Sequence, residues 1–345
     1  MRIAVTASLV TPLLPAQAGG AQAFVADLAR GLAGRGHEVR LYCAQGSRVE
    51  GVDLVPIPVD ASVAHALVMP GGPPRPPVPA LREGFGRLFD AVRADGPEAV
   101  SQHAFDEEAF HLAAGLPVLH TLHLPPLSPP VVAAARASGA PLATVSEAAR
   151  RLWRGAGLEA RVLRDGVPDF EAGEGPVSPC ALIAGRISPE KGTAAAVRVA
   201  RGAGLKPLVV GSVYDEGYHR RQVLPLLEGE GPLGPLPRPR LWRLMSASAV
   251  TLMPVEWEEP FGLVAAESQL AGCPVAAYRR GGLPEVVQEG VGGILVEPGD
   301  EAALVRAARA CLDLDRARVR ESARRLLLGP SLDAYELALG QVAAS

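Results

Sequence analysis

A short apolar strand, a glycine-containing loop and an amphipathic helix recur in that order along most of the chain. The first such unit runs from the apolar segment 2–8 through Gly19 and Gly20 into a helix, and then into a second apolar segment at 38–44. One face of that helix carries Phe24, Val25, Leu28 and Leu32. Strands that alternate with helices are typical of parallel α/β sheets, so the pattern predicts an α/β fold of doubly wound, Rossmann-like type.

The same pattern places further elements in both halves. Strands are predicted at 98–102, 117–122, 142–146, 180–184, 207–211, 250–255, 274–278 and 293–297, and helices of the second half at 193–201 and 262–270. The proline-rich segment 69–80 cannot be a helix or a central strand, because proline lacks the N–H donor and has a fixed φ. We expect it to be a surface loop.

A length of 345 residues corresponds to about two domains. Turn-forming residues cluster at 165–179, where the hydrophobic periodicity is lost. We therefore predict Rossmann-like domains at 1–168 and 169–328, followed by a last segment at 329–345. In doubly wound sheets ligands bind beyond the carboxyl ends of the strands, which directs attention to the loops after the strands and to a cleft between two facing domains.

The charge balance excludes one class of partner. The 34 basic and 37 acidic residues leave a net charge of -3, which gives no reason to expect general nucleic-acid binding. Among the basic residues only Lys191 and Lys206 are lysines. This composition is typical of a GC-rich genome that favours arginine codons.

The cysteines and the N-terminal segment indicate the compartment. The four cysteines are far apart and form no C-x-x-C pair, which favours free thiols in a reducing cytoplasm over a zinc site or a disulfide framework. No run of eighteen apolar residues predicts a membrane-spanning helix. Residues 1–18 imitate a secretory signal, but Pro12 and Pro15 interrupt the apolar run, and cleavage would delete the first strand. We expect a cytoplasmic protein.

The loop GRISPEKG at 185–192 supplies two cations, Arg186 and Lys191, just before a helix begins. The first N–H groups of a helix and its dipole already favour an anion at that point, so the loop is suited to a pyrophosphate. The alternative is a solvated loop with surface charges. Because most basic positions in this chain are arginine, a retained Lys191 suggests a site that needs a compact point charge.

The segment EEPFGLVAAE at 258–267 places Glu259 in a loop and Glu267 within the helix that follows. At 1.5 Å rise per residue, Glu267 lies roughly 7 to 8 Å below the helix start, which is about the reach from a bound phosphate to a ribose. Helix-surface charge is the alternative for two glutamates considered alone. A glycosidase pair is excluded, because one carboxyl lies at the rim and the other lies deep.

Other polar residues have weaker signals. His123 follows the strand 117–122, and His103 follows the strand 98–102, so both lie at the expected ligand end, although a strand histidine is often a core residue. His37 marks a turn between a helix and a strand. Asp313 and Asp315 imitate a metal-binding D-x-D pair, but their arginine-rich helical segment favours a solvated surface, and we predict no metal site.

Together these segments resemble the retaining glycosyltransferases of family 4, which have the GT-B fold. The resemblance lies in GRISPEKG, in EEPFGLVAAE as the E-x7-E motif, and in GCPV, GGLPEVV and GILVEPGD. In the first half it lies in Gly19-Gly20, GHEV, HTLH, TVSEAAR and RDGVPD, so that it covers nearly the whole chain.

The resemblance implies roles for the two domains and for single residues. Domain 1–168 would take the acceptor, domain 169–328 the nucleotide-sugar donor, and the helix in 329–345 would return to the first domain. Arg186 and Lys191 would contact the donor diphosphate, and Glu267 would contact the ribose. The sugar would be contacted by Glu259 together with Pro260, Phe261, Gly262 and Leu263. By the same resemblance, Gly19 and Gly20 would approach the phosphate, and Gly211 would line the nucleotide pocket. His123, which matches the family's T-x-H, and His103 would lie in the cleft.

Two positions depart from the family pattern. Gln22 stands where the family often has an acidic residue, which puts acceptor contacts in doubt. Asp165 begins DGVP where the family has NGVD, and Asp fits such a turn nearly as well as Asn.

The resemblance implies front-face transfer of a sugar from a nucleoside diphosphate sugar, without metal or other cofactor. UDP is the nucleotide expected first, from its frequency in the family. The acceptor, the oligomeric state and a peripheral contact with a membrane stay open. An epimerase of the same fold and a two-lobed sugar-binding protein are the alternatives. A nicotinamide enzyme is disfavoured, because no G-x-G-x-x-G follows a strand.

Overall fold

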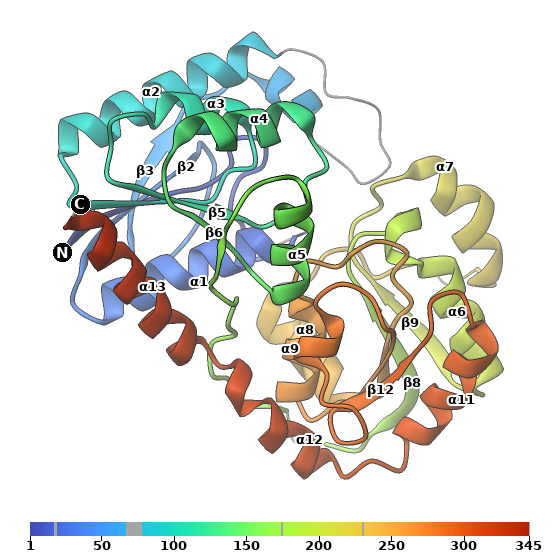
Figure 1. Ribbon diagram of the computed structural model, residues 1–345. Helices are drawn as coiled ribbons and strands as arrows, with labels where there is room; N and C mark the ends of the chain where they lie inside the picture. The colour runs from blue at the N-terminus through green and yellow to red at the C-terminus, as the bar shows by residue number, and fades with distance from the viewer. Residues whose placement is uncertain (17–18, 67–77, 174, 230, 345) are drawn as a thin grey trace. The chain divides into compact units, whose positions relative to one another are not determined.

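Each strand that the sequence predicts is present, and the strands of both sheets pair in parallel (Figure 1). A computed structural model describes the chain except residues 17–18, 67–77, 174, 230 and 345, with only the backbone of 65–66. The described chain forms two units. Unit 1 comprises Met1–Leu14, Ala21–Asp165 and the residues from Leu328 onwards, and unit 2 comprises Pro15–Gly20 and Gly166–Leu327.

Unit 1 is built on a seven-stranded sheet. Its order is β3 (Asp53–Ile57), β2 (Glu38–Ala44), β1 (Arg2–Thr6), β4 (Ala99–Gln102), β5 (Val118–Leu122), β6 (Leu142–Thr144) and β7 (Arg161–Val162). The order 3-2-1-4-5-6 is that of doubly wound nucleotide-binding folds. The edge strands β3 and β7 are absent from the prediction, because β3 contains Pro56 and β7 has two residues.

Helices cover both faces of this sheet. Ile3 and Val5 of β1 pack against α1 (Gly20–Gly34) and α13 (Leu328–Ala343), whereas Ala4 packs on the side of α2 (Pro79–Asp95). Successive strand residues point to opposite faces, so a strand covered on both sides is apolar throughout. The unit also contains η1 (Ala61–Ala66), α3 (Glu107–Leu112), α4 (Pro129–Ser138) and α5 (Glu147–Gly155).

The predicted loop at 69–80 is wrong at its end, because α2 begins at Pro79. Proline is tolerated in the first turn of a helix, where its missing N–H has no acceptor within the helix. Residues 69–77 of that loop lie outside the described residues.

Unit 2 is built on a five-stranded sheet with helices on both faces. Its order is β12 (Gly293–Val296), β11 (Val275–Tyr278), β10 (Ser248–Met253), β8 (Ser178–Ala184) and β9 (Lys206–Val210). Helices α6 (Thr193–Gly202) and α11 (Glu301–Cys311) pack on one face. On the other face lie residues of α8 (Arg238–Ala247) and α9 (Leu263–Leu270).

The remaining helices of unit 2 are short. They are η2 (Pro189–Lys191), α7 (Glu216–Tyr218), η3 (His219–Val223), η4 (Leu224–Leu226), α10 (Leu283–Val286), α12 (Arg316–Ala323) and η5 (Arg324–Leu326). Asp315 accepts hydrogen bonds from the N–H groups of Ala317 and Arg318 at 2.9 and 3.3 Å and so caps α12. The Asp315 carboxylate of the D-x-D pair is thus part of a helix cap.

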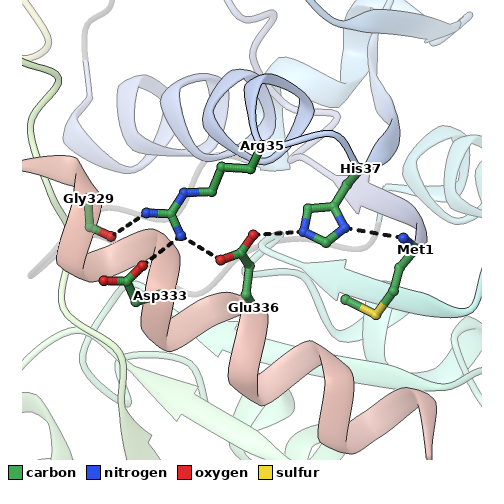
Figure 2. Close-up of polar contacts among 6 residues, drawn as sticks. All are labelled: Met1, Arg35, His37, Gly329, Asp333 and Glu336. Atoms are coloured by element: carbon green, nitrogen blue, oxygen red, sulfur yellow. Dashed lines mark hydrogen bonds and ion pairs between the residues drawn. The ribbon is translucent and has the colours of Figure 1, made fainter.

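The last helix, α13, packs on unit 1. Leu332 of α13 lies so close to α1 that a Cβ on Gly31 would be 2.7 Å from its Cδ1. A cluster of polar side chains lies beside this contact (Figure 2). Arg35 donates to Asp333 at 2.7 Å, and the His37 ring nitrogen Nε2 lies 2.8 Å from Oε1 of Glu336. His37, predicted to be a turn residue, therefore also holds the last helix.

Candidate active site

The loop after β8 carries Arg186 and Lys191 and ends at Gly192, where α6 begins. Gly192 has a φ of +66°, and a Cβ there would lie 2.0 Å from the backbone oxygen of Pro254. Pro254 directly follows β10. Because only glycine tolerates both this conformation and this approach, the loop after β8 can pack on the loop after β10.

Lys191 and Glu259, predicted separately, form an ion pair. Nζ of Lys191 donates to Oε2 of Glu259 at 2.6 Å, and Nε1 of Trp257 donates to the same oxygen at 2.8 Å. The Lys191 ammonium also lies 5.0 Å from the centroid of the Trp257 ring. The side chains of Lys191 and Glu259 keep 20% and 11% of their accessible surface, so solvent and a ligand can reach the pair.

The GGLPEVV turn fixes the backbone of Glu259. The N–H of Gly282 donates to the Glu259 carbonyl at 2.7 Å. A Cβ on Gly281, which has a φ of +55°, would lie 2.1 Å from that oxygen. A Cβ on Gly282 would lie 2.7 Å from the carbonyl oxygen of Pro260, so close backbone contact requires both glycines, and the turn after β11 positions the rim glutamate.

Arg186 lies in the same loop as Lys191 with other neighbours. Its Cζ is 5.3 Å from the centroid of the Tyr214 ring, and its Nη2 is 3.5 Å from Oε1 of Glu190. The start of α6 is partly occupied, because the N–H of Ala194 donates to the Tyr218 hydroxyl at 2.8 Å. One N–H donor of the predicted anion site at this helix start is therefore already bonded within the protein.

A second helix start lies in the E-x7-E segment. Gly262 precedes α9 with a φ of +99°, and a Cβ there would lie 2.7 Å from Cδ2 of Leu283. Pro260, Phe261 and Leu263 are buried around it. The first N–H groups of α9 have no acceptor within the helix, so this turn can offer donors to an anion.

Glu267 lies within α9 and is 3% exposed. Nε of Arg238 donates to its Oε1 at 2.7 Å, and Nη2 of Arg238 lies 2.7 Å from the same oxygen. The carboxylate predicted to bind ribose therefore has a guanidinium partner that the sequence analysis did not identify.

The glycines of the prediction have different surroundings. A Cβ on Gly211, which has a φ of +147°, would lie 1.8 Å from the carbonyl oxygen of Gly185. This close contact joins the ends of β8 and β9. Gly19 is half-buried, and Gly20 is exposed and begins α1.

His123 and His103 lie in unit 1 and are each 5% exposed. Nδ1 of His103 lies 2.9 Å from Nε2 of His123, and Nε2 of His103 lies 2.8 Å from the Ser101 hydroxyl. Nδ1 of His123 is 3.8 Å from Oδ1 of Asp165, which is also buried. Both ring nitrogens of each histidine thus face protein groups in this arrangement, and a contact of His123 with substrate stays a prediction.

Burial controls the protonation of this cluster. It lowers the pKa of His123 to about 4 and that of His103 well below its usual value, with the His123 charge as a second cause for His103. It also raises the pKa of Asp165 well above its usual value. Both imidazoles are therefore neutral at pH 7.

Sequence reasoning missed several neighbours of the predicted residues. Trp257 lies two residues before Glu259 and could have been considered with the motif. Arg238 and Tyr335 carry no such signal. Tyr335 of α13 lies with its ring centroid 5.9 Å from that of His103, and its hydroxyl donates to Thr121 at 3.3 Å.

Comparison with protein families covers nearly the whole chain. The family model "Glycosyltransferase Family 4" matches residues 18–169, and the model "Glycosyl transferases group 1" matches residues 170–326. The chain belongs to the glycosyltransferases. Two parallel α/β units, together with the structural neighbours below, identify the GT-B type and confirm the predicted fold class. The two family models confirm the predicted enzyme class.

Single relatives agree with this membership. A D-inositol 3-phosphate glycosyltransferase of Acidothermus cellulolyticus is 29% identical, over 90% of this chain and 83% of its own length. The sucrose-phosphate synthase structure from Thermosynechococcus elongatus matches all of both chains with a TM-score of 0.76 at 21% identity. The Anabaena HepE structure with UDP-glucose matches 99% of this chain and 100% of its own, with a TM-score of 0.76 at 19% identity.

Two findings on the described residues of this glycosyltransferase concern membranes and metal ions. No helix among them has both the length and the apolar character to cross a bilayer. In the same part of the chain, no three His, Cys, Asp or Glu side chains gather as a metal site. Independence from metal stays a prediction.

Proposed function

We propose that this glycosyltransferase moves a sugar from a nucleoside diphosphate sugar to a hydroxyl acceptor, with retention of the anomeric configuration. UDP is the first nucleotide proposed for the donor. The observation that carries the proposal is the Lys191–Glu259 contact of 2.6 Å. It joins a cation from the loop after β8 to a carboxylate beside the start of α9. A diphosphate placed at that helix start can take over the ammonium, which leaves Glu259 to accept from sugar hydroxyls.

The proposed reaction is a front-face displacement. The bond from the anomeric carbon to the diphosphate oxygen breaks, and the bond to the acceptor oxygen forms on the same face of the sugar. The acceptor proton passes to an oxygen of the departing diphosphate. Lys191, Arg186 and the N–H groups at the start of α9 stabilise the charge that develops on the leaving group.

Two comparisons support the choice of substrates. The HepE structures were solved with UDP-glucose, UDP and glucose, which supports UDP as the first nucleotide to test. Several relatives are named D-inositol 3-phosphate glycosyltransferases, which makes a phosphorylated polyol the first acceptor to test.

The donor is tested by thermal shift with UDP, GDP and ADP and with their sugars. A ligand at 100 times its Kd stabilises the folded state by about 2.7 kcal/mol. We expect one nucleotide to stabilise the wild type and Lys191→Ala to lose most of that shift. An unchanged shift in Lys191→Ala would contradict the proposed donor site.

The reaction is tested with the donor that binds and with D-inositol 3-phosphate as acceptor. We expect NMR of the product to show the anomeric configuration of the donor, and Lys191→Ala and Glu267→Ala to abolish transfer. Activity should survive EDTA. An inverted product would exclude the front-face mechanism, and loss of activity in EDTA would exclude metal independence.

The same assays separate the alternatives. An epimerase would interconvert donor sugars without any acceptor, and a two-lobed binding protein would bind a free sugar without turnover. Membership of the glycosyltransferases favours transfer over both.

A further inference from the structure

The Arg238–Glu267 contact lies deep in unit 2. The side chains of Arg238 and Glu267 keep only 12% and 4% of their accessible surface. An ionised carboxylate at such a position is costly unless an opposite charge lies beside it. The guanidinium supplies that charge through two nitrogens at 2.7 Å from one carboxylate oxygen, Oε1.

The guanidinium is itself held in place by aromatic side chains. Cζ of Arg238 lies 4.9 Å from the centroid of the Trp242 ring, one turn along α8. Trp242 stacks on Phe170 with ring centroids 4.1 Å apart and an angle of 12° between the planes. Phe170 is fixed in turn, since Arg320 donates to its carbonyl at 3.1 Å. A planar guanidinium suits this stack better than an ammonium does.

The segment that leads into α8 is hydrogen-bonded to the region predicted to bind the nucleotide. The N–H of Gly211 at the end of β9 donates to the carbonyl of Gly234 at 3.0 Å. Gly234 lies four residues before Arg238, in the segment that enters α8. The segment that delivers Arg238 to Glu267 is thereby tied to the glycine predicted to line the nucleotide pocket.

We propose that Arg238 is a positioning residue that holds the Glu267 carboxylate and orients it toward the ribose hydroxyls of the donor. The proposal rests on the proposed function, in which Glu267 binds the ribose. An ionised carboxylate accepts hydrogen bonds from both hydroxyls, whereas a protonated one must donate its own proton to a neighbour. Without Arg238 the carboxylate loses the two nitrogens that hold Oε1, and its orientation toward the ribose hydroxyls is no longer fixed.

The experiment compares UDP with 2′-deoxy-UDP by isothermal titration calorimetry. If GDP or ADP is the nucleotide that binds, it and its 2′-deoxy form take their place. The ratio of the two Kd values measures recognition of the ribose hydroxyl, and ionisation of the diphosphate cancels in the ratio at each pH. The variants are Glu267→Ala, Arg238→Met and Arg238→Lys, with Arg240→Met, an exposed arginine of the same helix, as the matched control.

We expect the wild type and Arg240→Met to prefer UDP about tenfold to hundredfold, the range of a hydrogen bond to a charged group. Glu267→Ala should bring the ratio close to 1 at every pH. Arg238→Met should bring it close to 1 at both pH 6 and pH 8, because the carboxylate loses the partner that orients it. The ratio for Arg238→Lys should be intermediate, since lysine restores the positive charge without the planar pair of N–H donors.

Three results would overturn the role of Arg238. One is a wild-type ratio in Arg238→Met at both pH values. Another is a variant that binds both nucleotides more weakly with the ratio unchanged, as a purely structural residue would. The third is tighter UDP binding, which would mean that Arg238 competes with the ribose. A wild-type ratio in Glu267→Ala would instead overturn the ribose assignment in the proposed function.

Discussion

Lys191 is one of two lysines in a chain that otherwise uses arginine, and it is the one in contact with a predicted site carboxylate. Its ammonium fits between Oε2 of Glu259 and the face of Trp257. A guanidinium is wider and would bind Glu259 through two nitrogens, which opposes the exchange of partners that the proposed reaction needs.

We therefore expect Lys191→Arg to lower kcat/KM by about tenfold or more, which corresponds to about 1.4 kcal/mol of transition-state stabilisation. Steady-state rates with the donor identified above measure the effect. Lys206→Arg is the matched control, because Lys206 is exposed at the start of β9. Equal rates in the wild type and Lys191→Arg would mean that the retained lysine has no catalytic meaning.

At the residue scale, sequence reasoning finds a site residue when its motif is local. The loop of Arg186 and Lys191 and the E-x7-E segment have fixed spacings that chemistry explains. Arg238 has no such spacing to Glu267, because the two meet through the packing of α8 beside α9. Asp165 was identified only as a turn residue, and its approach to His123 depends on how the chain leaves β7.

At the scale of elements, the packing of α13 on α1 depends on a residue without a side chain. A Cβ on Gly31 would lie 2.7 Å from both Cδ atoms of Leu332 and 3.2 Å from its Cγ, whereas a Cβ on Gly34 in the same helix would meet no atom of the described residues within 4 Å. Alanine in place of glycine favours a helix by about 1 kcal/mol, but overpacking a buried contact costs about 1 to 3 kcal/mol.

We therefore expect Gly34→Ala to raise the free energy of unfolding and Gly31→Ala to give a value about 1 to 3 kcal/mol below that of Gly34→Ala. Urea unfolding of the two variants and the wild type measures both effects. Equal stability of the two variants would show that α13 does not pack on α1 at this point.

Elements were predicted well where the periodicity extends over several residues. Helix α9 begins one residue later than predicted, and α6 ends one residue later. The edge strand β3 was missed because Pro56 lies within it, and proline argues against a strand. The boundary at Pro79 was missed because proline both ends loops and begins helices.

At the scale of the whole molecule, buried histidines make stability depend on pH. Burial lowers the pKa of His120 to about 3, and its ring stacks on Phe110 with centroids 4.4 Å apart. Neither of its ring nitrogens has a hydrogen-bond partner among the residues that the structure describes. The unfolded chain, with a histidine pKa of about 6.5, binds the proton that the folded chain excludes, so stability falls as the pH drops below about 6.5.

We expect His120→Phe to remove this contribution, which amounts to about 2 kcal/mol at pH 5 relative to pH 8. Calorimetric Tm values should therefore show a gap between the variant and the wild type that widens as the pH falls. His123 and His103 act in the same direction as His120, whereas the raised pKa of Asp165 acts in the opposite direction. A gap that stays constant from pH 8 to pH 5 would contradict neutral burial of His120.

The sequence by itself determined the order along the chain of most strands and of the main helices, and the loops at the carboxyl ends of those strands, with their glycines and charges. Periodicity, turn chemistry and motif spacing are local properties of the chain, so they can be recognised without coordinates. The tertiary structure decided which charged and polar side chains meet: Lys191 with Glu259, Arg238 with Glu267, and the two buried histidines with each other and Asp165. These partners lie far apart along the chain, and packing of the sheets and helices is what brings them within hydrogen-bond or ion-pair distance.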